Sequence, residues 1–315
     1  MTLNRRTFFG RMAASCVAQA HAQTRPIPII DTHIHLFDQT RPQGAPYAGG
    51  RGNTLPSIPT RYRKLAAPLG IVGAIAIEAS PWIEDNLWLL QIEESDPIMV
   101  GAIGNLQPEK PEFKEYLERY HKNKLFLGIR YGNLWNYSLV NQVANPIFLE
   151  GVKLMQQVDL LFETANPRPD LLEAVVKLSD KVPDLRILID HVPAMLRRAA
   201  DATAKASIDA SIRELAKRDR IYIKVSEVMQ VVNEKPALDV ALYKPGLDYL
   251  FDAFGENKLV FGSDWPNGPA VENLPSIVKI VQDYFHAKGE AASEKYFWKN
   301  SQAAYKWVHR DASQP

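Results

Sequence analysis

A closely spaced pair of histidines ends the first apolar run of the chain. His33 and His35 stand two residues apart in the stretch 28–38, and a polar region rich in Pro and Gly follows them. In an extended strand, side chains at this spacing share one face and lie about 6–7 Å apart. Two such imidazoles can share a divalent metal ion. Since pairs of this kind also arise by chance on solvated surfaces, the rest of the chain must supply further ligands.

The elements that would position the pair form a regular alternation. After the first strand at 28–35, seven more short apolar runs appear, and each is followed by a helical pattern. The runs lie at 72–79, 99–106, 125–131, 159–164, 185–192, 221–226 and 259–265. Alternating strands and helices build a parallel sheet, and eight such units in about 260 residues fit a (β/α)8 TIM barrel. We therefore predict an α/β protein of this architecture.

The helices and connections complete this expectation. Helices are predicted at 82–94, 111–122, 146–157, 169–181, 204–217, 242–254 and 271–286, with a closing helix at 296–307. Residues 38–62 read as a long polar connection. No glycine-rich dinucleotide motif follows the first strand, which disfavours a dinucleotide-binding fold. No linker divides residues 23–315, so we expect one domain.

Polar residues stand at the carboxyl ends of the predicted strands, where barrel enzymes carry their active sites. They are His33, His35, Glu78, Asn105, Arg130, Glu163, Asp190, His191, Lys224, Glu227 and Asp264. Buried charges are costly unless they are paired, so a set of this size indicates a site. The remaining histidines of the predicted domain, at 121, 286 and 309, lie in charged helical surroundings and are expected at the surface.

Asp264 ends the last predicted strand, which lies beside the first because a barrel closes on itself. Its carboxylate can complete a metal site with His33 and His35, or act as a base on water. The alternative is a local turn or helix cap before Pro266. Arg130 and Lys224 also have two roles open to them: they can bind a substrate carboxylate, or form ion pairs with Glu163 or Glu227.

The first 22 residues resemble a twin-arginine signal peptide. Arg5-Arg6 precedes Phe8-Phe9, a short weakly apolar run follows, and Ala20-His21-Ala22 fits a cleavage site. We expect removal of residues 1–22 and export of the folded protein to the periplasm or the extracellular space.

Composition narrows the classes of partner. The chain has 315 residues and a formal net charge of +1, without the basic face that nucleic-acid binding needs. Its single cysteine excludes a disulfide framework and Cys-based zinc sites. No apolar stretch reaches the roughly 18 residues of a membrane span. Composition therefore disfavours a nucleic-acid partner and a transmembrane span.

An ordered set of motifs resembles the amidohydrolase-2 family of the amidohydrolase superfamily. The resemblance is strongest to its branch of TIM-barrel metal-dependent hydrolases, which contains sugar lactonases and 2-pyrone-4,6-dicarboxylate lactonase. The motifs are DTHIHLFD (31–38), IEAS (77–80), GIR (128–130), IDH (189–191), IKVS (223–226), FGSDWP (261–266) and WKN (298–300).

The resemblance implies a hydrolase that opens a carboxylated or hydroxylated lactone. Asp264 would activate water and His191 would be the histidine of the sixth strand. It implies at most one divalent metal ion, with zinc as the first choice. His33 and His35 would bind this ion, with Glu78, Asp264 or His191 nearby. Members of this branch differ in whether they need a metal, so metal-free catalysis stays open. Substrate contacts would come from Arg130, Lys224 and Glu163, and from Tyr47 and Arg51 in the long connection. The alternatives are a metal-dependent decarboxylase of aromatic acids and an exported barrel that binds a sugar acid without turnover.

Overall fold

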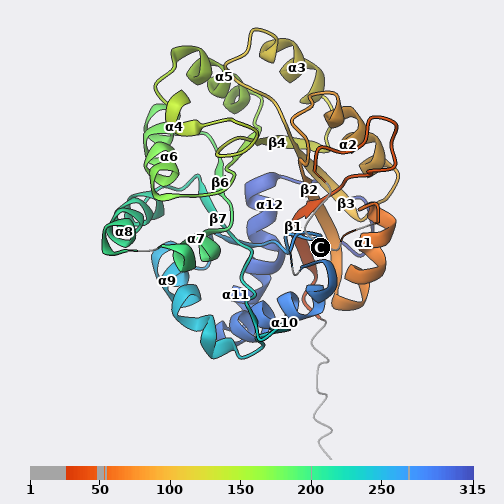
Figure 1. The fold of residues 1–315 in the computed structure, drawn as a ribbon, viewed down its shortest axis with the longest axis vertical. Helices are drawn as coiled ribbons and strands as arrows, with labels where there is room; N and C mark the ends of the chain where they lie inside the picture. The colour runs from red at the N-terminus through yellow and green to blue at the C-terminus, as the bar shows by residue number, and fades with distance from the viewer. Residues whose placement is uncertain (1–25, 48–52, 54, 200, 269) are drawn as a thin grey trace, which may run out of the picture.

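The computed structural model describes residues 26–47, 53, 55–199, 201–268 and 270–315. Its centre is one sheet of eight parallel strands in chain order. The strands are β1 Ile29–His35, β2 Ile71–Ile77, β3 Met99–Gly104, β4 Phe126–Arg130, β5 Leu161–Glu163, β6 Ile187–Ile189, β7 Ile221–Val225 and β10 Leu259–Phe261. Figure 1 shows the helices as a ring around these strands. The structure confirms the predicted barrel.

Closure of the barrel joins β1 to the segment that follows β10. The amide of His35 donates to the carbonyl of Trp265 over 2.7 Å, and the amide of Asp264 donates to the carbonyl of His33 over 2.8 Å. Ile34 and Trp265 form an isolated parallel bridge at the same place. We call this junction the seam. It brings the first and last strand ends, with their polar residues, directly together.

Most of the outer helices begin near the expected residues. These are α2 Asp85–Glu94, α3 Phe113–Tyr120, α5 Pro146–Gln157, α6 Pro169–Lys181, α8 Ala202–Ala216, α9 Lys244–Phe254 and α10 Ala270–Lys288. The sequence did not predict the shorter helices α1 Pro59–Ala66, α4 Leu139–Gln142, α7 Val192–Arg198 and α11 Glu290–Glu294. Short 3-10 turns lie at Ala67–Leu69 and Val240–Leu242, and a small hairpin pairs β8 Val231–Val232 with β9 Lys235–Pro236.

Two packing regions hold the barrel together. All seven residues of β1 are buried, as expected for a strand covered on both faces. One apolar cluster lies between the sheet and the helices. A second contains the alternate strand residues Ile30, Ile75 and Leu188, packed with Tyr305 and Trp307. The π-helical turn Lys295–Lys299 and α12 Asn300–Tyr305 therefore close one end of the barrel, in place of the single closing helix expected at 296–307.

Three boundaries differ from the sequence expectations for identifiable reasons. The connection predicted at 38–62 ends earlier, because Pro59 starts α1 and its apolar face, including Tyr62, packs against the barrel. The strands predicted at 185–192 and 259–265 end at Ile189 and Phe261. His191 and Asp264 have left-handed φ angles of 49° and 65°, which a strand cannot contain.

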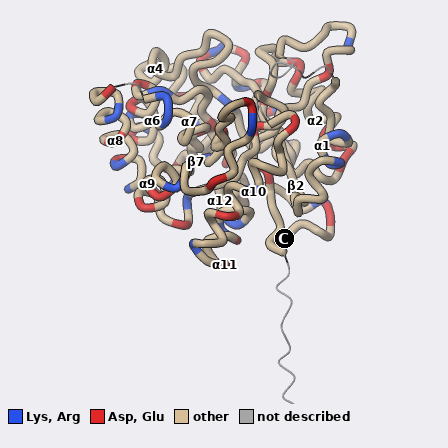
Figure 2. Tube along the Cα trace, turned by 60° about the horizontal axis from the view of Figure 1, so that its bottom comes forward, with Lys and Arg blue, Asp and Glu red and all other residues tan. Residues whose placement is uncertain are grey.

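Along the chain trace, Lys and Arg are interspersed with Asp and Glu (Figure 2). Within the described residues, no helix is sufficiently long and apolar to span a membrane.

Candidate active site

A cavity of about 540 Å³ opens at the carboxyl ends of the barrel strands. Its wall includes six of the polar residues predicted at strand ends, together with residues of the following loops. The lining includes His35, Tyr47, Glu78, Arg130, Trp135, His191, Arg197, Glu227, Asp264 and Asn267. The strand ends of this barrel therefore converge on one enclosed space, as the fold class predicts.

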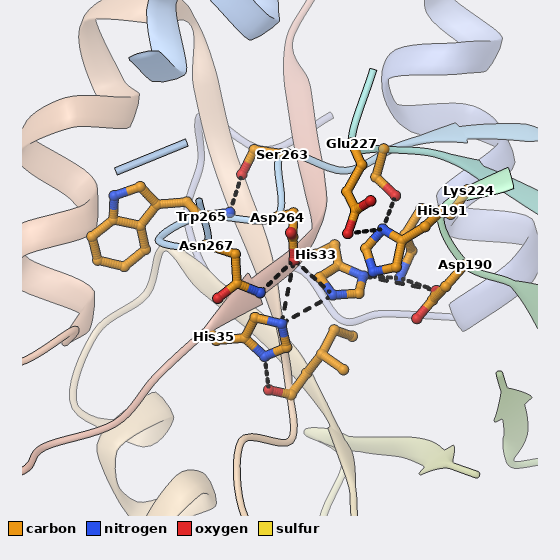
Figure 3. A network of polar contacts seen from close by, with 12 residues as sticks. His33, His35, Asp190, His191, Lys224, Glu227, Ser263, Asp264, Trp265 and Asn267 are labelled. Carbon is orange, nitrogen blue, oxygen red and sulfur yellow. Dashed lines mark hydrogen bonds and ion pairs between the residues drawn. The ribbon is translucent and has the colours of Figure 1, made fainter. Parts of the chain in front are cut away.

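Three side chains meet at the seam and form what we call the site triad: His33, His35 and Asp264. Nε2 of His33 lies 3.2 Å from Nε2 of His35. Oδ1 of Asp264 lies 3.4 Å from each of these two nitrogens. Figure 3 shows the three atoms turned toward one another. The i, i+2 spacing in β1 and the backbone hydrogen bonds of the seam together produce this convergence.

The spacing of the triad fits a single metal ion. In tetrahedral coordination with bonds of about 2.0–2.1 Å, two ligand atoms lie about 3.3–3.4 Å apart. The three distances in the triad match this edge length, and three protein ligands leave the fourth position open, as in catalytic zinc sites. Two looser groups, His33–Asp190–His191 and His191–Glu227–Asp264, also bring potential ligand atoms within 4.8 Å of one another.

The proton positions on the two imidazoles decide how well they can act as ligands. Nδ1 of His35 lies 3.1 Å from the carbonyl oxygen of Ile77, so it carries the proton and leaves the Nε2 lone pair free. Nδ1 of His33 lies 3.1 Å from Nζ of Lys224. When Lys224 donates there, the His33 proton sits on Nε2 and faces the lone pair of His35 Nε2, 3.2 Å away. Metal ligation by His33 requires the other tautomer.

The ionisation of Asp264 and His33 suits a base next to a neutral imidazole. Burial and the charge of Lys224 lower the pKa of His33 well below its ordinary value, so the ring is neutral. Burial by itself would raise the pKa of Asp264, but the polar contact with His35 and the positive charge of Arg130 hold it below the usual value. Asp264 is therefore a carboxylate at neutral pH.

Beneath the triad lies a second group, which we call the inner cluster: Glu163, Asp190 and Lys224. Nζ of Lys224 lies 2.6 Å from Oε1 of Glu163 and 3.3 Å from Oδ1 of Asp190. All three residues are fully buried. Lys224 and Glu163, expected to contact substrate, do not line the cavity in the described part of the chain. Their placement favours the alternative role foreseen for Lys224, an ion pair with Glu163.

Arg130 and His191 lie together on one wall of the cavity. The guanidinium of Arg130 contacts Oδ2 of Asp190 through Nη2 at 3.0 Å and through Nε at 3.1 Å. Nδ1 of His191 lies 2.8 Å from Oγ of Ser226, and its Nε2 lies 3.5 Å from Nη2 of Arg130. Because arginine only donates, Nε2 of His191 is the acceptor and Nδ1 carries the proton.

Glu78 lines the cavity but stands apart from the metal-sized groups found among the described residues. Its Oε2 accepts from the indole nitrogen of Trp135 over 2.9 Å, and its Oε1 lies 3.8 Å from Nη1 of Arg130. Burial raises the pKa of Glu78 to about 7, against the lowering effect of Arg130. Glu78 therefore changes charge near neutral pH.

The long connection supplies part of the cavity wall. Tyr47 lines the cavity and its hydroxyl donates to Oδ1 of Asn267. Burial, followed by the charge of Asp264, raises the pKa of Tyr47 to about 12. Arg51, the other substrate contact expected from this connection, lies outside the described residues.

Three cavity residues escaped the sequence reasoning: Trp135, Arg197 and Asn267. Trp135 belongs to the loop after β4 and has a φ of 55°. Arg197 reaches from α7 to the carbonyls of Glu227 and Val228. Only Asn267 carried a usable signal, because it follows the strand-end motif Asp264-Trp265-Pro266 by one residue. The other two are placed by loops whose paths leave no pattern in the sequence.

Comparison with known proteins matches this arrangement to one family. The family model described as amidohydrolase matches residues 30–307. The chain belongs to this amidohydrolase family. A curated relative, an L-fucono-1,5-lactonase from Burkholderia multivorans, is 23% identical over 291 residues, covering 87% of this chain and 94% of the relative. The predicted family and the predicted class, hydrolase, are confirmed.

Two solved structures of this amidohydrolase fold are instructive. An amidohydrolase from Burkholderia multivorans with bound zinc is 21% identical, covers 89% of this chain and 100% of its own, and gives a TM-score of 0.73. A 5-carboxyvanillate decarboxylase from Novosphingobium aromaticivorans was solved in complex with manganese and a nitrobenzoic acid. It is 14% identical, covers 89% of this chain and 96% of its own, and gives a TM-score of 0.62. At these identities the likeness establishes the fold.

Proposed function

We propose that this amidohydrolase opens the ring of a lactone by adding water to its ester carbonyl. The observation that carries the proposal is the site triad, whose three ligand atoms lie 3.2–3.4 Å apart at the seam. His35 and Asp264 also border a cavity of about 540 Å³, a volume suited to a small molecule. The lactonase activity named for the curated relatives supports the choice of bond.

The triad would hold one divalent cation, with zinc as our first choice, and would leave its remaining position to water. Such a cation polarises both a water molecule and an ester carbonyl. Glu78 is the less suitable ligand, because its carboxylate is already engaged by Trp135. His33 can join only as the tautomer that carries its proton on Nδ1, where Glu163 and Asp190 each lie 3.8 Å away.

Asp264 acts as the general base in this proposal. It takes a proton from the water whose oxygen bonds to the carbonyl carbon, a role worth about 10²–10⁴-fold in rate. Arg130, with His191 accepting from its Nη2, donates to the carbonyl oxygen as negative charge develops there. The ring C–O bond then breaks, and Asp264 returns its proton to the leaving oxygen to give the hydroxy acid. In the metal-free version, Nε2–H of His33 would also stabilise the oxyanion.

The charges of the cavity favour a hydroxylated lactone without a carboxylate. Three acids, Glu78, Glu227 and Asp264, line it together with two arginines. Arg130 is already paired with Asp190, and Arg197 with the backbone carbonyls of the loop after β7. A substrate carboxylate would therefore meet more negative than uncommitted positive charge. Sugar hydroxyls, in contrast, can donate to these acids.

Decarboxylation of an aromatic acid is the second candidate, and the fold that the chain shares with a decarboxylase supports keeping it. That reaction would release CO₂ and need no hydrolytic water. Simple capture of a sugar acid is less well supported, because binding alone does not require the triad. We also propose that residues 1–22 direct export by the twin-arginine route, to the periplasm or beyond the cell.

The proposal is tested by a pH-indicator assay of the purified protein with a panel of sugar lactones that includes L-fucono-1,5-lactone. We expect acid release above the spontaneous rate from at least one lactone, loss of that activity on chelation, and recovery with Zn²⁺ or Mn²⁺. Activity that ignores the chelator would support the metal-free version. Failure on every lactone, with CO₂ release from aromatic acids, would replace the proposal by the second candidate.

A further inference from the structure

Asn267 connects the base of the site to the loop that follows β1. It stands three residues after Asp264, and its amide N–H donates to the carbonyl of Asp264 over 2.7 Å. This turn brings the Asn267 side chain back onto the aspartate. Its Nδ2 donates to Oδ1 of Asp264 over 2.9 Å.

The oxygen that Asn267 contacts is the one that belongs to the site triad. Oδ1 of Asp264 lies 3.4 Å from Nε2 of both His33 and His35, so the amide contact is its shorter one. A carboxylate can turn about its terminal bond, because that torsion has a broad energy minimum. The hydrogen bond from Asn267 restricts this rotation and keeps Oδ1 aimed at the two imidazoles (Figure 3).

The other end of the Asn267 amide is also held. Its Oδ1 accepts from the hydroxyl of Tyr47, whose ring lies 5.9 Å from the ring of His35 and 6.0 Å from that of Phe37. A primary amide has one accepting and one donating end. The carboxylate of Asp264 only accepts, so the NH₂ group must face Asp264, and the amide oxygen then faces Tyr47, whose hydroxyl donates to it. The reverse orientation would set two oxygens against each other.

We propose that Asn267 is a positioning residue that holds Asp264 Oδ1 in place for a divalent cation, and that Tyr47 anchors the oxygen end of the Asn267 amide. Substitution of a residue that is hydrogen-bonded to a metal ligand typically changes metal affinity or activity by about 10–100-fold. The inference depends on the proposed lactone hydrolysis only for its turnover measurement, since zinc binding can be measured without substrate.

The test uses the full chain with the variants Asn267→Leu and Tyr47→Phe. Leucine keeps the shape of asparagine and removes the donor. We expect zinc affinity, measured by competition with a chelator, to fall about 10–100-fold in N267L and less in Y47F. With the lactone that the wild type opens, kcat should fall while KM stays near the wild-type value. The thermal midpoint without zinc should not change.

Asn166→Leu is the matched control for zinc affinity. Asn166 borders the same cavity, but its amide donates to the carbonyl of Asn133. Wild-type zinc affinity in N267L, an equal loss in N166L, or a wild type that binds no zinc would each overturn the inference. A wild type that binds zinc and opens no lactone would refute the proposed function alone, and the affinities of the variants would still decide the role of Asn267.

Discussion

The site triad and the inner cluster lie next to each other at the same end of the barrel, yet they differ in how their charges are satisfied. In the inner cluster one ammonium group faces two acidic side chains, at 2.6 and 3.3 Å. In the triad a carboxylate faces two imidazoles, with three ligand atoms converging on one point. The inner cluster contains its own cation, whereas the triad has the geometry to accept one.

This difference separates a structural from a functional role for similar residues. A buried ion pair that is already complete has little left to offer a substrate, but removing one partner strands the other charge in the interior. A set of converging lone pairs gains most when a cation is supplied. We therefore expect substitutions in the triad to affect turnover first, and substitutions in the inner cluster to affect stability first.

The largest effect should come from Asp264→Asn. The amide keeps the shape of the carboxylate but cannot take a proton from water, so turnover should fall at least about 10²–10⁴-fold. The free energy of unfolding should change little, because the side chain borders the cavity. Initial rates and a urea titration would measure both. A variant with near-normal rates would remove Asp264 from its role and end the contrast between the two groups.

Lys224→Met should have the opposite profile. It leaves Glu163 buried without its cation and Asp190 with Arg130 as its remaining cation, which should lower the free energy of unfolding by about 3–5 kcal/mol. The matched control is Lys217→Met, at an exposed lysine paired with Glu214, where the expected loss is at most about 1 kcal/mol.

If the Lys224 variant does not fold, the double variant Lys224→Met/Glu163→Gln should recover part of the loss, because it removes a stranded charge. If denaturant titrations gave equal losses in the free energy of unfolding for the Lys224 and Lys217 variants, the inner cluster would not have the structural role assigned to it.

Glu78, which belongs to neither the site triad nor the inner cluster, should have a smaller effect, on the pH dependence of the free energy of unfolding. Burial raises its pKa from 4.5 to about 7, so between these values the folded protein keeps a proton that the unfolded chain releases. The free energy of unfolding contributed by Glu78 therefore falls as the pH rises through this window. Between pH 5 and 7, the free energy of unfolding should fall by about 1–3 kcal/mol less in Glu78→Gln than in the wild type. Parallel slopes in the two proteins would contradict the raised pKa.

The barrel and the histidine pair could be predicted from the sequence because both depend on local order. Apolar runs mark the strands, and the i, i+2 spacing sets the common face of His33 and His35. The direction in which a longer side chain points could not be predicted in this way. Arg130 and Lys224 both end strands, but Arg130 borders the cavity while Lys224 turns inward to Glu163.

Long-range contacts account for the rest of what the sequence did not reveal. Tyr62 was assigned to the polar connection, yet it is buried and donates to Oδ2 of Asp31 over 2.6 Å. The helix α7 begins directly after His191, because that residue takes a left-handed conformation. The contact between Tyr47 and Asn267 spans 220 positions. Neither propensity nor periodicity encodes such pairings.

The seam has a consequence for how the molecule responds to heat. The first and last strands of the barrel are fastened by two backbone hydrogen bonds and by the three side chains that converge there. An ion bound by those side chains would cross-link the two ends of the barrel sheet, since its ligands come from parts of the chain more than 200 positions apart. Its binding free energy would add to the work of unfolding the whole barrel, so the metallated enzyme should melt at a higher temperature than the metal-free enzyme even with no substrate present.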